Sequence, residues 1–281
     1  MKIEKTKVFN FEGAFRGMRN PLDSWKKADS TFGLFKYECD EDAWGIAEAY
    51  YGDPNWPNTE DYDELRASEE KIEKIQEWLL DQGIKMEEES DCGEYVFIGP
   101  NDMNLAQKLI KGGAVHRKFL RQIMVSVDIT APLYWFKEFD TYKVGTTANS
   151  CSTMHKIQSY PIEIDNFEID DFCPSLVFWT DDNGDNPVDY EVKDHIEDHI
   201  LFLEKLRQKY LETKDKRYWK ELIRWLPEGW LQKRTVTMNY ENLRNMYEWR
   251  KDHKLTEWHT FCDWIKTLPY SFELIIYGLD E

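Results

Sequence analysis

The chain has 281 residues, of which 41% are hydrophobic, 15% aromatic and 32% charged, and its formal net charge is -18. This apolar and aromatic content is enough to build a buried core, which excludes an intrinsically disordered chain. The negative charge argues against a surface that wraps duplex nucleic acid, because such binding needs many Lys and Arg side chains to neutralise phosphates. A small phosphorylated ligand stays compatible with it, since a few local donors suffice.

The sequence has no run of about 18 apolar residues that could span a bilayer, and the opening MKIEKTKVFNFEG lacks the apolar centre of a signal peptide. We therefore expect a cytoplasmic protein that neither enters a membrane nor is secreted. The five cysteines are far apart and form no C-x-x-C pair. This pattern predicts reduced thiols, with neither a disulfide framework nor a metal site.

The first third of the chain opens with a predicted strand at 2–11 and a short helix at 12–19, which ends at Asn20-Pro21. The segment 34–95 is acidic and rich in turns, with one predicted helix at 64–82. We interpret it as an acidic elaboration on a single domain, whose core is formed by about residues 1–33 and 96–281.

The remaining elements follow from apolar periodicity, helix capping and turn residues. We predict helices at 104–111, at 130–139 with Pro132 in its first turn, and at 191–210, 215–225, 239–250 and 256–266, with strands at 119–129 and 231–238. This order predicts an α+β fold in which a mixed sheet is flanked by helices.

Two motifs resemble metal sites. His195 and His199 stand four residues apart, which places both imidazoles on one helix face, but Ile196 occupies the position where a zincin motif needs Glu. The turn cluster DDNGDNP at 181–187 resembles a calcium loop without its closing Glu. We interpret the first as a solvated charged face and the second as a solvated loop.

A third motif, NSCSTMH, contains Cys151, Ser152 and His155 in a polar segment of small residues. One interpretation is a nucleophile, Cys151 or Ser152, with His155 as its base. The other is a turn or strand end, because neighbours in sequence rarely form a catalytic dyad. The residues alone leave both open.

The helix predicted at 239–250 places Asn239, Leu243, Met246 and Arg250 on one stripe, since 11 residues at about 100° each complete about three turns. One hypothesis is a binding face for a flat ligand with an anionic group, with a polar residue at each end and an apolar floor. The alternative is a capping Asn and a surface Arg whose aliphatic part covers apolar neighbours.

The same region carries a longer spaced motif. Leu226-Pro227 precedes the predicted strand, Asn239 leads the following helix, and Arg250 ends it. This order and spacing resemble the C-terminal signature of the flavin-dependent thymidylate synthases. The resemblance implies the fold of that family and, in it, contacts of Asn239 and Asn245 with flavin. It also implies that Arg250 lies against the uracil ring and stabilises charge on the pyrimidine.

The middle of the chain is similar to the family more loosely, and residues 35–115 and 156–222 are not covered. The matching positions are His116 at the start of the central strand, Tyr134-Trp135-Phe136 before the flavin motif, and Asn149-Ser150-Cys151-Ser152 as the Asn-x-x-Ser nucleotide loop. Where the family has Arg-His-Arg, this chain has Lys137-Glu138-Phe139. The Arg expected after Ser152 is missing, so Arg224, Arg234, Lys143 or backbone N–H groups would contact the phosphate.

The resemblance assigns each candidate residue a role. Flavin binding falls to His116, Lys137, Glu138, Asn149, Asn239 and Asn245, and nucleotide binding to Tyr134, Ser150, Ser152, Arg224, Arg234 and Arg250. Arg250 and Ser152 are the expected catalytic-site residues, Ser152 as a group that positions the nucleotide.

The function implied is flavin-dependent methylation at C5 of a pyrimidine nucleotide such as dUMP, or a closely related one-carbon transfer. Its cofactor would be FAD, with NADPH and methylenetetrahydrofolate as co-substrates. A homotetramer is implied as well, with the Trp-rich C-terminal helices as interface material. The alternative, suggested by the missing Arg residues, is a catalytically inactive member of the fold that binds a nucleotide or another protein.

Overall fold

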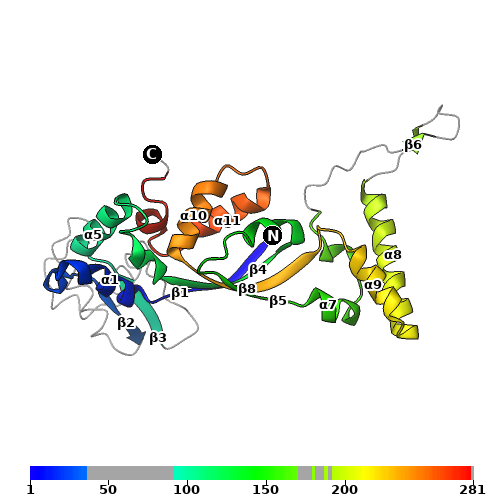
Figure 1. The fold of residues 1–281 in the computed structure, drawn as a ribbon, viewed down its shortest axis with the longest axis horizontal. Coiled ribbons are helices and arrows are strands. Elements are labelled where there is room, and N and C mark those ends of the chain that lie inside the picture. Colours follow the sequence, from blue (N-terminus) through cyan, green and yellow to red (C-terminus); the bar gives the residue numbers. More distant parts are fainter. Residues whose placement is uncertain (37–91, 170–178, 181–186, 189–191, 280–281) are drawn as a thin grey trace, which may run out of the picture. The chain divides into compact units, whose positions relative to one another are not determined.

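The computed structural model describes residues 1–36, 92–169, 179–180, 187–188 and 192–279 (Figure 1). The chain divides into two compact units that interleave in sequence. Unit 1 consists of Met1–Lys7, Ser126–Met238 and His253–Phe261, and unit 2 of Val8–Val125, Asn239–Asp252 and Cys262–Glu281. The helix predicted at 64–82 and the turn cluster at 181–186 lie outside the described residues.

Unit 1 is built on a four-stranded sheet with the strand order β1-β4-β8-β5. Its strands are β1 (Lys2–Phe9), β4 (Met124–Pro132), β5 (Thr147–Ser150) and β8 (Leu231–Asn239). Burial alternates along β4, where Val125, Val127 and Ile129 are buried and their neighbours are half-buried. This period of two, with β-branched residues on the buried side, is typical of a strand with one face on a core.

An aromatic cluster fills the core of unit 1. Helix α6 (Leu133–Phe139) buries Trp135, Phe136 and Phe139. The ring of Trp135 stacks on Phe139 at a centroid distance of 5.0 Å and lies 4.8 Å from the ring of Trp258 in helix α11 (Thr256–Lys266). Such large rings contribute most of the buried area per residue, so α6 is held in place by its apolar face.

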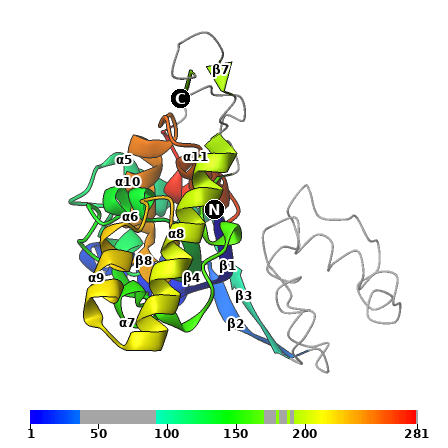
Figure 2. The same ribbon diagram turned by 90° about the vertical axis from the view of Figure 1, so that its right-hand side faces the viewer.

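A second, smaller core in unit 1 lies under the helix pair α8 (Val192–Thr213) and α9 (Lys216–Arg224), which run side by side (Figure 2). Its buried residues are Ile157, Ile162, Phe167, Leu203 and Leu222. Helix α7 (Thr153–Lys156) comes directly before Ile157 in the chain. The short strands β6 (Trp179–Thr180) and β7 (Pro187–Val188) pair antiparallel. Asp215 caps α9 by accepting a hydrogen bond from the N–H of Arg217 at 2.9 Å.

Unit 2 contains α1 (Phe11–Arg19), the antiparallel pair β2 (Thr31–Lys36) and β3 (Cys92–Phe97), α5 (Pro100–Lys111) and α10 (Tyr240–Arg250). A π-helical turn at Ser271–Ile275 contacts both α5 and α10. Aromatic rings again join the helices: Phe11 lies edge-on to Tyr240 at 5.6 Å, and Phe15 to Phe119 at 5.8 Å. Aromatic contacts therefore join α1 to α10 and to the 3-10 turn at Lys118–Arg121.

A buried ion pair ties α1 to α5 inside unit 2. The side chains of Arg19 and Asp102 are 4% and 2% exposed, and the Arg19 Nε atom lies 2.5 Å from a carboxylate oxygen of Asp102. The carboxylate also accepts hydrogen bonds from the hydroxyl of Ser30 at 2.6 Å and from the N–H groups of Asp29 and Ser30. Arg19 donates further to the backbone carbonyls of Ser24 and Lys27. Every strong donor and acceptor of the pair is thus matched, as a buried charge requires.

The α+β fold predicted from the sequence is confirmed, and most predicted elements are present. Three boundaries were wrong. The helix predicted from 104 starts at Pro100. Residues 118–121 form a 3-10 turn, so the strand predicted from 119 starts at Met124. Pro132 ends β4 and precedes α6 instead of lying inside its first turn, because the strand continues through the predicted start of the helix. No described helix is long and apolar enough to cross a membrane.

Candidate functional site

Ser150 and Arg234, two of the predicted nucleotide residues, meet where the edge strand β5 pairs with β8, and the predicted flavin residue Asn149 lies next to Ser150. The antiparallel register of β5 with β8 places Ser150 opposite Arg234 and Asn149 opposite Thr235. The side chains of Asn149 and Ser150 are exposed. The structure therefore brings a hydroxyl, an amide and a guanidinium group to one stretch of the sheet, although Arg234 is far from the other two residues in the sequence. We call Asn149, Ser150 and Arg234 the edge cluster.

Arg234 is the most strongly positioned cation of this cluster. Its side chain is 13% exposed, and its guanidinium carbon lies 3.8 Å from the centre of the Phe136 ring. One terminal nitrogen contacts the Asp140 carboxylate at 2.7 Å, and Nε donates to the Gln232 side chain at 2.9 Å. Stacking on an aromatic ring and a planar hydrogen-bond fork hold the guanidinium in one orientation. Asp140 is half-exposed and partly compensates the charge.

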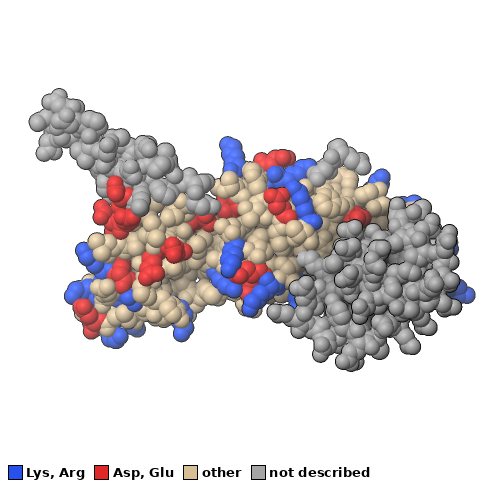
Figure 3. Space-filling model, turned by 180° about the vertical axis from the view of Figure 1, so that it is seen from behind, with Lys and Arg blue, Asp and Glu red and all other residues tan. Residues whose placement is uncertain are grey.

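The neighbouring cation, Lys233, is compensated as well. Its ammonium lies 3.0 Å from the carboxylate of Asp128 and 4.0 Å from that of Glu4. Hydrogen bonds from Thr235 and Lys233 hold the pKa of Asp128 below its usual range, and the bond to Asp128 raises the pKa of Lys233. The face in Figure 3 shows the same character, with Lys and Arg next to Asp and Glu.

Ser152 caps helix α7. Its hydroxyl oxygen accepts a hydrogen bond from the backbone N–H of His155 at 3.1 Å. The amide of Gln232 donates to the carbonyl of Cys151 and to the hydroxyl of Thr153. His155 thus contacts Ser152 through its backbone N–H. Within the described residues, no hydrogen bond joins the His155 imidazole to Cys151 or Ser152. The geometry favours the turn over the nucleophile for the motif at 149–155.

Helix α6 places Tyr134, Lys137 and Glu138 in separate contacts. The hydroxyl of Tyr134 donates to the carboxylate of Glu257. Lys137 pairs with Glu228 at 2.6 Å, and both side chains are more than half exposed. Glu138 accepts from the Trp258 indole at 3.0 Å and lies 3.3 Å from His253 Nε2. At the position where the family has Arg-His-Arg, this chain therefore has an acid bound to its own core.

His253 is engaged at both ring nitrogens. The N–H of Leu255 donates to Nδ1 at 3.2 Å, so Nδ1 is the acceptor and Nε2 carries the proton toward Glu138. A neutral imidazole satisfies both contacts. We therefore interpret the Glu138–His253 pair as a structural link and not as a catalytic base.

Arg224 ends α9, and its guanidinium pairs with Glu221 one turn earlier. The indole of Trp225 donates to the second carboxylate oxygen of Glu221 at 3.0 Å. Arg224 is about half exposed, so this surface pair contributes little and can exchange for a phosphate at small cost.

In unit 2, His116 is exposed and lies in the turn after α5, where its N–H donates to the carbonyl of Gly113 at 2.9 Å. Asn245 accepts from Arg117 at 3.5 Å. The Nε–H of the same Arg117 is shared between the two carboxylate oxygens of Glu241, at 3.0 and 3.1 Å. Sequence reasoning missed Arg117 and Glu241. A basic residue beside His116 and an acid in the first turn of the predicted helix were the only signals for them.

The structure decides between the two hypotheses for the stripe on α10. Leu243 and Met246 are fully buried and Asn239 is 7% exposed, so burial contradicts the first of the two hypotheses, in which these residues form an apolar floor for a ligand. The stripe faces the core of unit 2, because apolar side chains at this spacing gain most free energy by burial. The capping alternative is confirmed for Asn239, which accepts from the N–H of Asn242 at 3.0 Å in a reciprocal capping box. Arg250 is the last residue of α10.

The cap supplies a first test. Replacing Asn239 with Ala is expected to lower the free energy of unfolding by about 1 kcal/mol, because the N–H of Asn242 loses its acceptor. Thermal unfolding followed by circular dichroism measures this loss. Asn239→Ser, which keeps an acceptor, should regain most of it, and equal stability of the Ala and Ser variants would contradict the capping role.

Comparisons with known proteins find matches to this chain by structure but not by sequence. No protein-family model matches the chain, and no curated protein matches it by sequence. Two solved structures of the flavin-dependent thymidylate synthase ThyX from Helicobacter pylori, both with FAD and dUMP, align over almost the whole chain. One has a TM-score of 0.52 at 14% identity and covers 99% of both chains. The other has a TM-score of 0.50 at 13% identity and covers 98% of both.

The chain has the fold of the flavin-dependent thymidylate synthases. Identities of 13% and 14% establish this fold and leave activity to be argued from residues. In the thymidylate synthase-like fold, β5, β8 and α6 position the edge cluster and its partners Phe136 and Asp140. The described residues contain no group of three or more His, Cys, Asp or Glu arranged to hold a metal ion.

Proposed function

We propose that the protein is a flavin-dependent enzyme that methylates a pyrimidine nucleotide of the dUMP type at C5, or performs a closely related one-carbon transfer. The observation that carries this proposal is the likeness to a thymidylate synthase over 98–99% of both chains. The aligned structures hold FAD and dUMP. The spaced residues from Leu226 to Arg250 support the same assignment independently, because they resemble the family in sequence alone.

For the nucleotide, the proposal gives each residue a separate task. Arg234 would contact the phosphate, since its orientation is already fixed by Phe136 and Asp140. Ser150 and Ser152 would donate or accept hydrogen bonds as positioning groups, and Tyr134 and Arg224 would add further polar contacts. Arg250 would stabilise negative charge on the uracil ring as C5 is activated.

The residues present fit a flavin in their donor chemistry. The side chains of Asn239 and Asn245 use their oxygens as acceptors within the described residues, which leaves each amide NH2 group to donate to a ligand. Among the residues that the structure describes, Lys137 pairs with the exposed Glu228, and exchange of such a pair costs less than about 1 kcal/mol. His116 and Asn149 are exposed. Glu138, the remaining residue of the assigned set, is an acceptor bound to Trp258 and His253 and supplies no donor.

Bound FAD would supply the hydride that reduces the transferred one-carbon unit, with NADPH and methylenetetrahydrofolate as co-substrates. The chain itself would orient the ligands and stabilise charge. Our proposal also keeps a homotetramer, a cytoplasmic location, and a single domain that comprises both interleaved units. The acidic composition supports the absence of duplex nucleic acid among its partners.

A second candidate function is a nucleotide-binding or protein-interaction protein without catalytic activity. It is favoured by Glu138, which stands where the family has a cationic flavin motif and is bound to Trp258 and His253. A carboxylate there weakens the attraction for the anionic pyrophosphate of FAD. The edge cluster could bind a nucleotide phosphate in such a non-catalytic protein as well as in an enzyme.

A visible absorption spectrum of the purified protein distinguishes the two functions. We expect yellow protein with flavin bands, or uptake of added FAD followed by titration of flavin fluorescence. Colourless protein that does not bind added FAD would rule out the enzyme. The matched variant Glu138→Gln removes the charge and keeps an acceptor for Trp258, so we expect it to bind FAD more tightly than the parent.

Nucleotide binding is tested separately with dUMP by calorimetry. Arg250→Ala should weaken dUMP binding about 10-fold or more, because it removes a charged hydrogen-bond donor. Lys254→Ala, a nearby cation without an assigned role, is the control. Equal affinity in the parent and Arg250→Ala would remove Arg250 from the proposed site.

A further inference from the structure

Guanidinium groups gather around one carboxylate in unit 2. Arg117 precedes the 3-10 turn at Lys118–Arg121, and both Arg117 and Arg121 lie against Glu241 of α10. The Nε–H of Arg117 is shared between the two oxygens of Glu241 at 3.0 and 3.1 Å, and a terminal nitrogen of Arg121 lies 4.0 Å from one of them. The side chain of Glu241 is 8% exposed. A single buried acid therefore serves two cations.

Arg244, one turn further along α10, brings a third guanidinium group, which forms no ion pair among the described residues. Arg244 is 5% exposed, and one terminal nitrogen donates to the carbonyls of Ile275 at 2.7 Å and Tyr277 at 2.9 Å. Its Nε atom is buried, and the described residues provide no acceptor for it. Burial, and then the nearby charge of Arg117, lower the pKa of Arg244, so the two guanidinium groups repel each other.

Positive charge exceeds negative charge around these side chains. Among the described residues, the exposed Glu248 and the buried Glu241 oppose the lowering of the Arg244 pKa. Against these two carboxylates stand three guanidinium groups and the exposed ammonium of Lys118. We call Arg117, Arg121, Arg244 and Glu241 the arginine cluster. Its excess of positive charge, in a chain of formal net charge -18, favours an anionic ligand.

The arginine cluster keeps hydrogen-bond donors for such a ligand, because a guanidinium group has five N–H donors. Arg117 uses its Nε–H for Glu241 and one terminal nitrogen for Asn245 at 3.5 Å, and its other terminal nitrogen has no acceptor among the described residues. Arg121 is 53% exposed and donates to the carbonyl of Ala114 at 3.4 Å. A ligand can therefore bind both guanidinium groups while Glu241 stays in place.

The donors of the arginine cluster suit a phosphate group. Planar guanidinium groups match phosphate oxygens in two-pronged hydrogen bonds, and they keep their charge at neutral pH. The exposed His116 directly precedes Arg117, and Asn245 is a hydrogen-bond partner of Arg117. His116 and Asn245 both belong to the proposed flavin set. Since FAD carries a pyrophosphate, the cluster supplies cations beside two proposed contacts of this cofactor.

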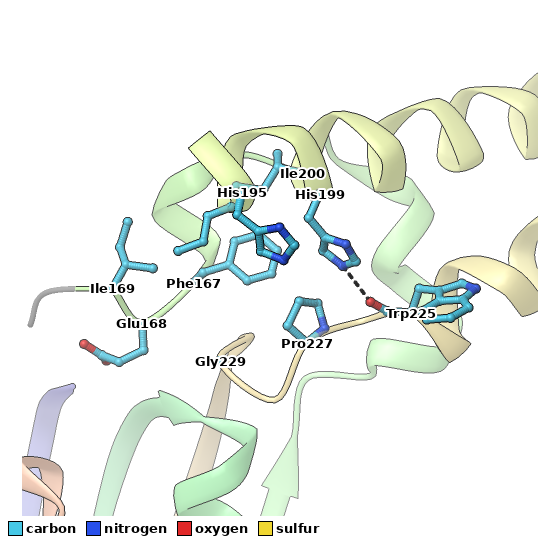
Figure 4. A pocket seen from close by; sticks show the side chains of 10 residues that line it. Phe167, Glu168, Ile169, His195, His199, Ile200, Trp225, Pro227 and Gly229 are labelled. Atoms are coloured by element: carbon cyan, nitrogen blue, oxygen red, sulfur yellow. Dashed lines mark hydrogen bonds between the residues drawn. The ribbon is translucent and has the colours of Figure 1, made fainter. Parts of the chain in front are cut away.

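The pocket of unit 1 lacks such donors. It has a volume of about 350 Å³ and lies between the start of α8 and the loop that joins α9 to β8 (Figure 4). His195 and His199, interpreted from the sequence as a solvated face, line it, and a dashed line in Figure 4 joins His199 Nε2 to the carbonyl oxygen of Trp225, 2.9 Å away. Among the described residues that line the pocket, none is Lys or Arg. The arginine cluster therefore offers a phosphate better-matched donors.

We propose that the arginine cluster binds the pyrophosphate group of a nucleotide cofactor, which in the proposed enzyme is FAD. Arg117 and Arg121 contact the phosphate oxygens, and the buried Arg244 adds positive potential without touching the ligand. The cluster thereby replaces the cationic motif whose position Lys137-Glu138-Phe139 occupies. The choice of FAD rests on the proposed function, whereas the recognition of a pyrophosphate rests on the cluster itself.

The test compares ADP, FAD and riboflavin as ligands of the full chain, because ADP carries the pyrophosphate without flavin and riboflavin carries flavin without phosphate. Calorimetry measures ADP binding, and the change in flavin fluorescence measures the other two. Arg121→Gln should weaken ADP and FAD binding about 10-fold, as the loss of one charged hydrogen bond implies, and leave riboflavin binding unchanged. Arg121→Lys, which keeps the charge, should lose less affinity than Arg121→Gln. A merely structural role of Arg121 would weaken all three ligands alike.

Glu241→Gln should have the opposite effect and strengthen ADP binding by up to about fivefold, because it removes the carboxylate that competes for Arg117 and Arg121. Circular dichroism checks that this buried variant folds, and the exposed Arg121 variants decide the test if it does not. The matched control is Lys26→Gln, which removes an exposed cation of unit 2 in the 3-10 turn Trp25–Lys27 and should bind all three ligands as the parent does.

Equal ADP affinity in the parent and in Arg121→Gln would overturn the proposal, as would the absence of ADP binding to the parent. Displacement of ADP by dUMP would overturn it too, because ADP would then occupy the proposed dUMP site. FAD binding that does not change in Arg121→Gln overturns the inference and leaves the proposed enzyme intact. ADP binding that depends on Arg121, without any uptake of FAD, supports the pyrophosphate site and contradicts the proposed function instead.

Discussion

Asp102→Asn is expected to lower the free energy of unfolding by about 3–5 kcal/mol, because it leaves the buried guanidinium of Arg19 without its counter-charge. The substitution also puts an amide NH2 group against at least one of the donors from Arg19, Asp29 and Ser30 that converge on the carboxylate. For a protein of this size, a loss of about 3–5 kcal/mol corresponds to a decrease in Tm of roughly 10 °C. Thermal unfolding by circular dichroism measures it directly.

The control for this variant is Asp263→Asn. Asp263 forms an ion pair of similar length with Lys266, at 2.8 Å, but its side chain is 71% exposed. Solvent screens an exposed pair, so its loss should change stability by less than about 1 kcal/mol. Similar Tm values for both variants would show that burial of the Arg19–Asp102 pair does not determine its contribution. The double variant Arg19→Met, Asp102→Leu should be more stable than Asp102→Asn alone, since it buries no unpaired charge.

Arg234→Ala is expected to weaken dUMP binding by about 10- to 100-fold, because a charged hydrogen bond to phosphate contributes roughly 1.5–3 kcal/mol. The reason lies in its geometry: the guanidinium is already oriented by Phe136 at 3.8 Å and is mostly buried. Little side-chain entropy is then lost on binding. Calorimetric titration with dUMP provides the measurement.

The neighbouring acid gives a second arm of this experiment. Asp140→Asn removes the carboxylate that competes for Arg234, so dUMP binding should strengthen by up to about fivefold. Arg217→Ala is the control, because Arg217 is a cation of the same unit whose side chain is 90% exposed and pairs with Asp215. Unchanged affinity in Arg234→Ala would exclude the edge cluster as the phosphate site, and weaker binding in Asp140→Asn would show that Asp140 supports binding instead.

Local patterns predicted the elements well where apolar periodicity and caps agreed. The helices α8 to α11 and the strand β8 were expected within a few residues, and Asn239 and Asp215 cap their helices as Ser, Thr, Asp and Asn generally do. Prediction was poorer at Pro132. Nothing local to the sequence shows that the strand β4 continues to this residue, because its length depends on the strands beside it.

The site was predicted less completely than the elements. Spacing identified Arg250 and Asn239 as candidates, and the family resemblance added Ser150. Spacing left a binding face and a capped surface helix as open alternatives for the stripe on α10. Burial of Leu243 and Met246 decided against the binding face, since the same spacing describes a binding face and a core face. Which carboxylate meets which cation also stayed hidden, because Asp140 and Arg234 are 94 residues apart in the sequence.

The sequence by itself determined the α+β class, the order of the C-terminal elements and the resemblance to the flavin-dependent thymidylate synthases. These features depend on periodicity and spacing, which are properties of neighbouring residues. Only the tertiary structure decided that Ser150 faces Arg234, that Glu138 is bound to Trp258 and His253, and that His195 and His199 line a pocket. Such contacts join distant segments, and their geometry follows from how sheet and helices bury their apolar faces together.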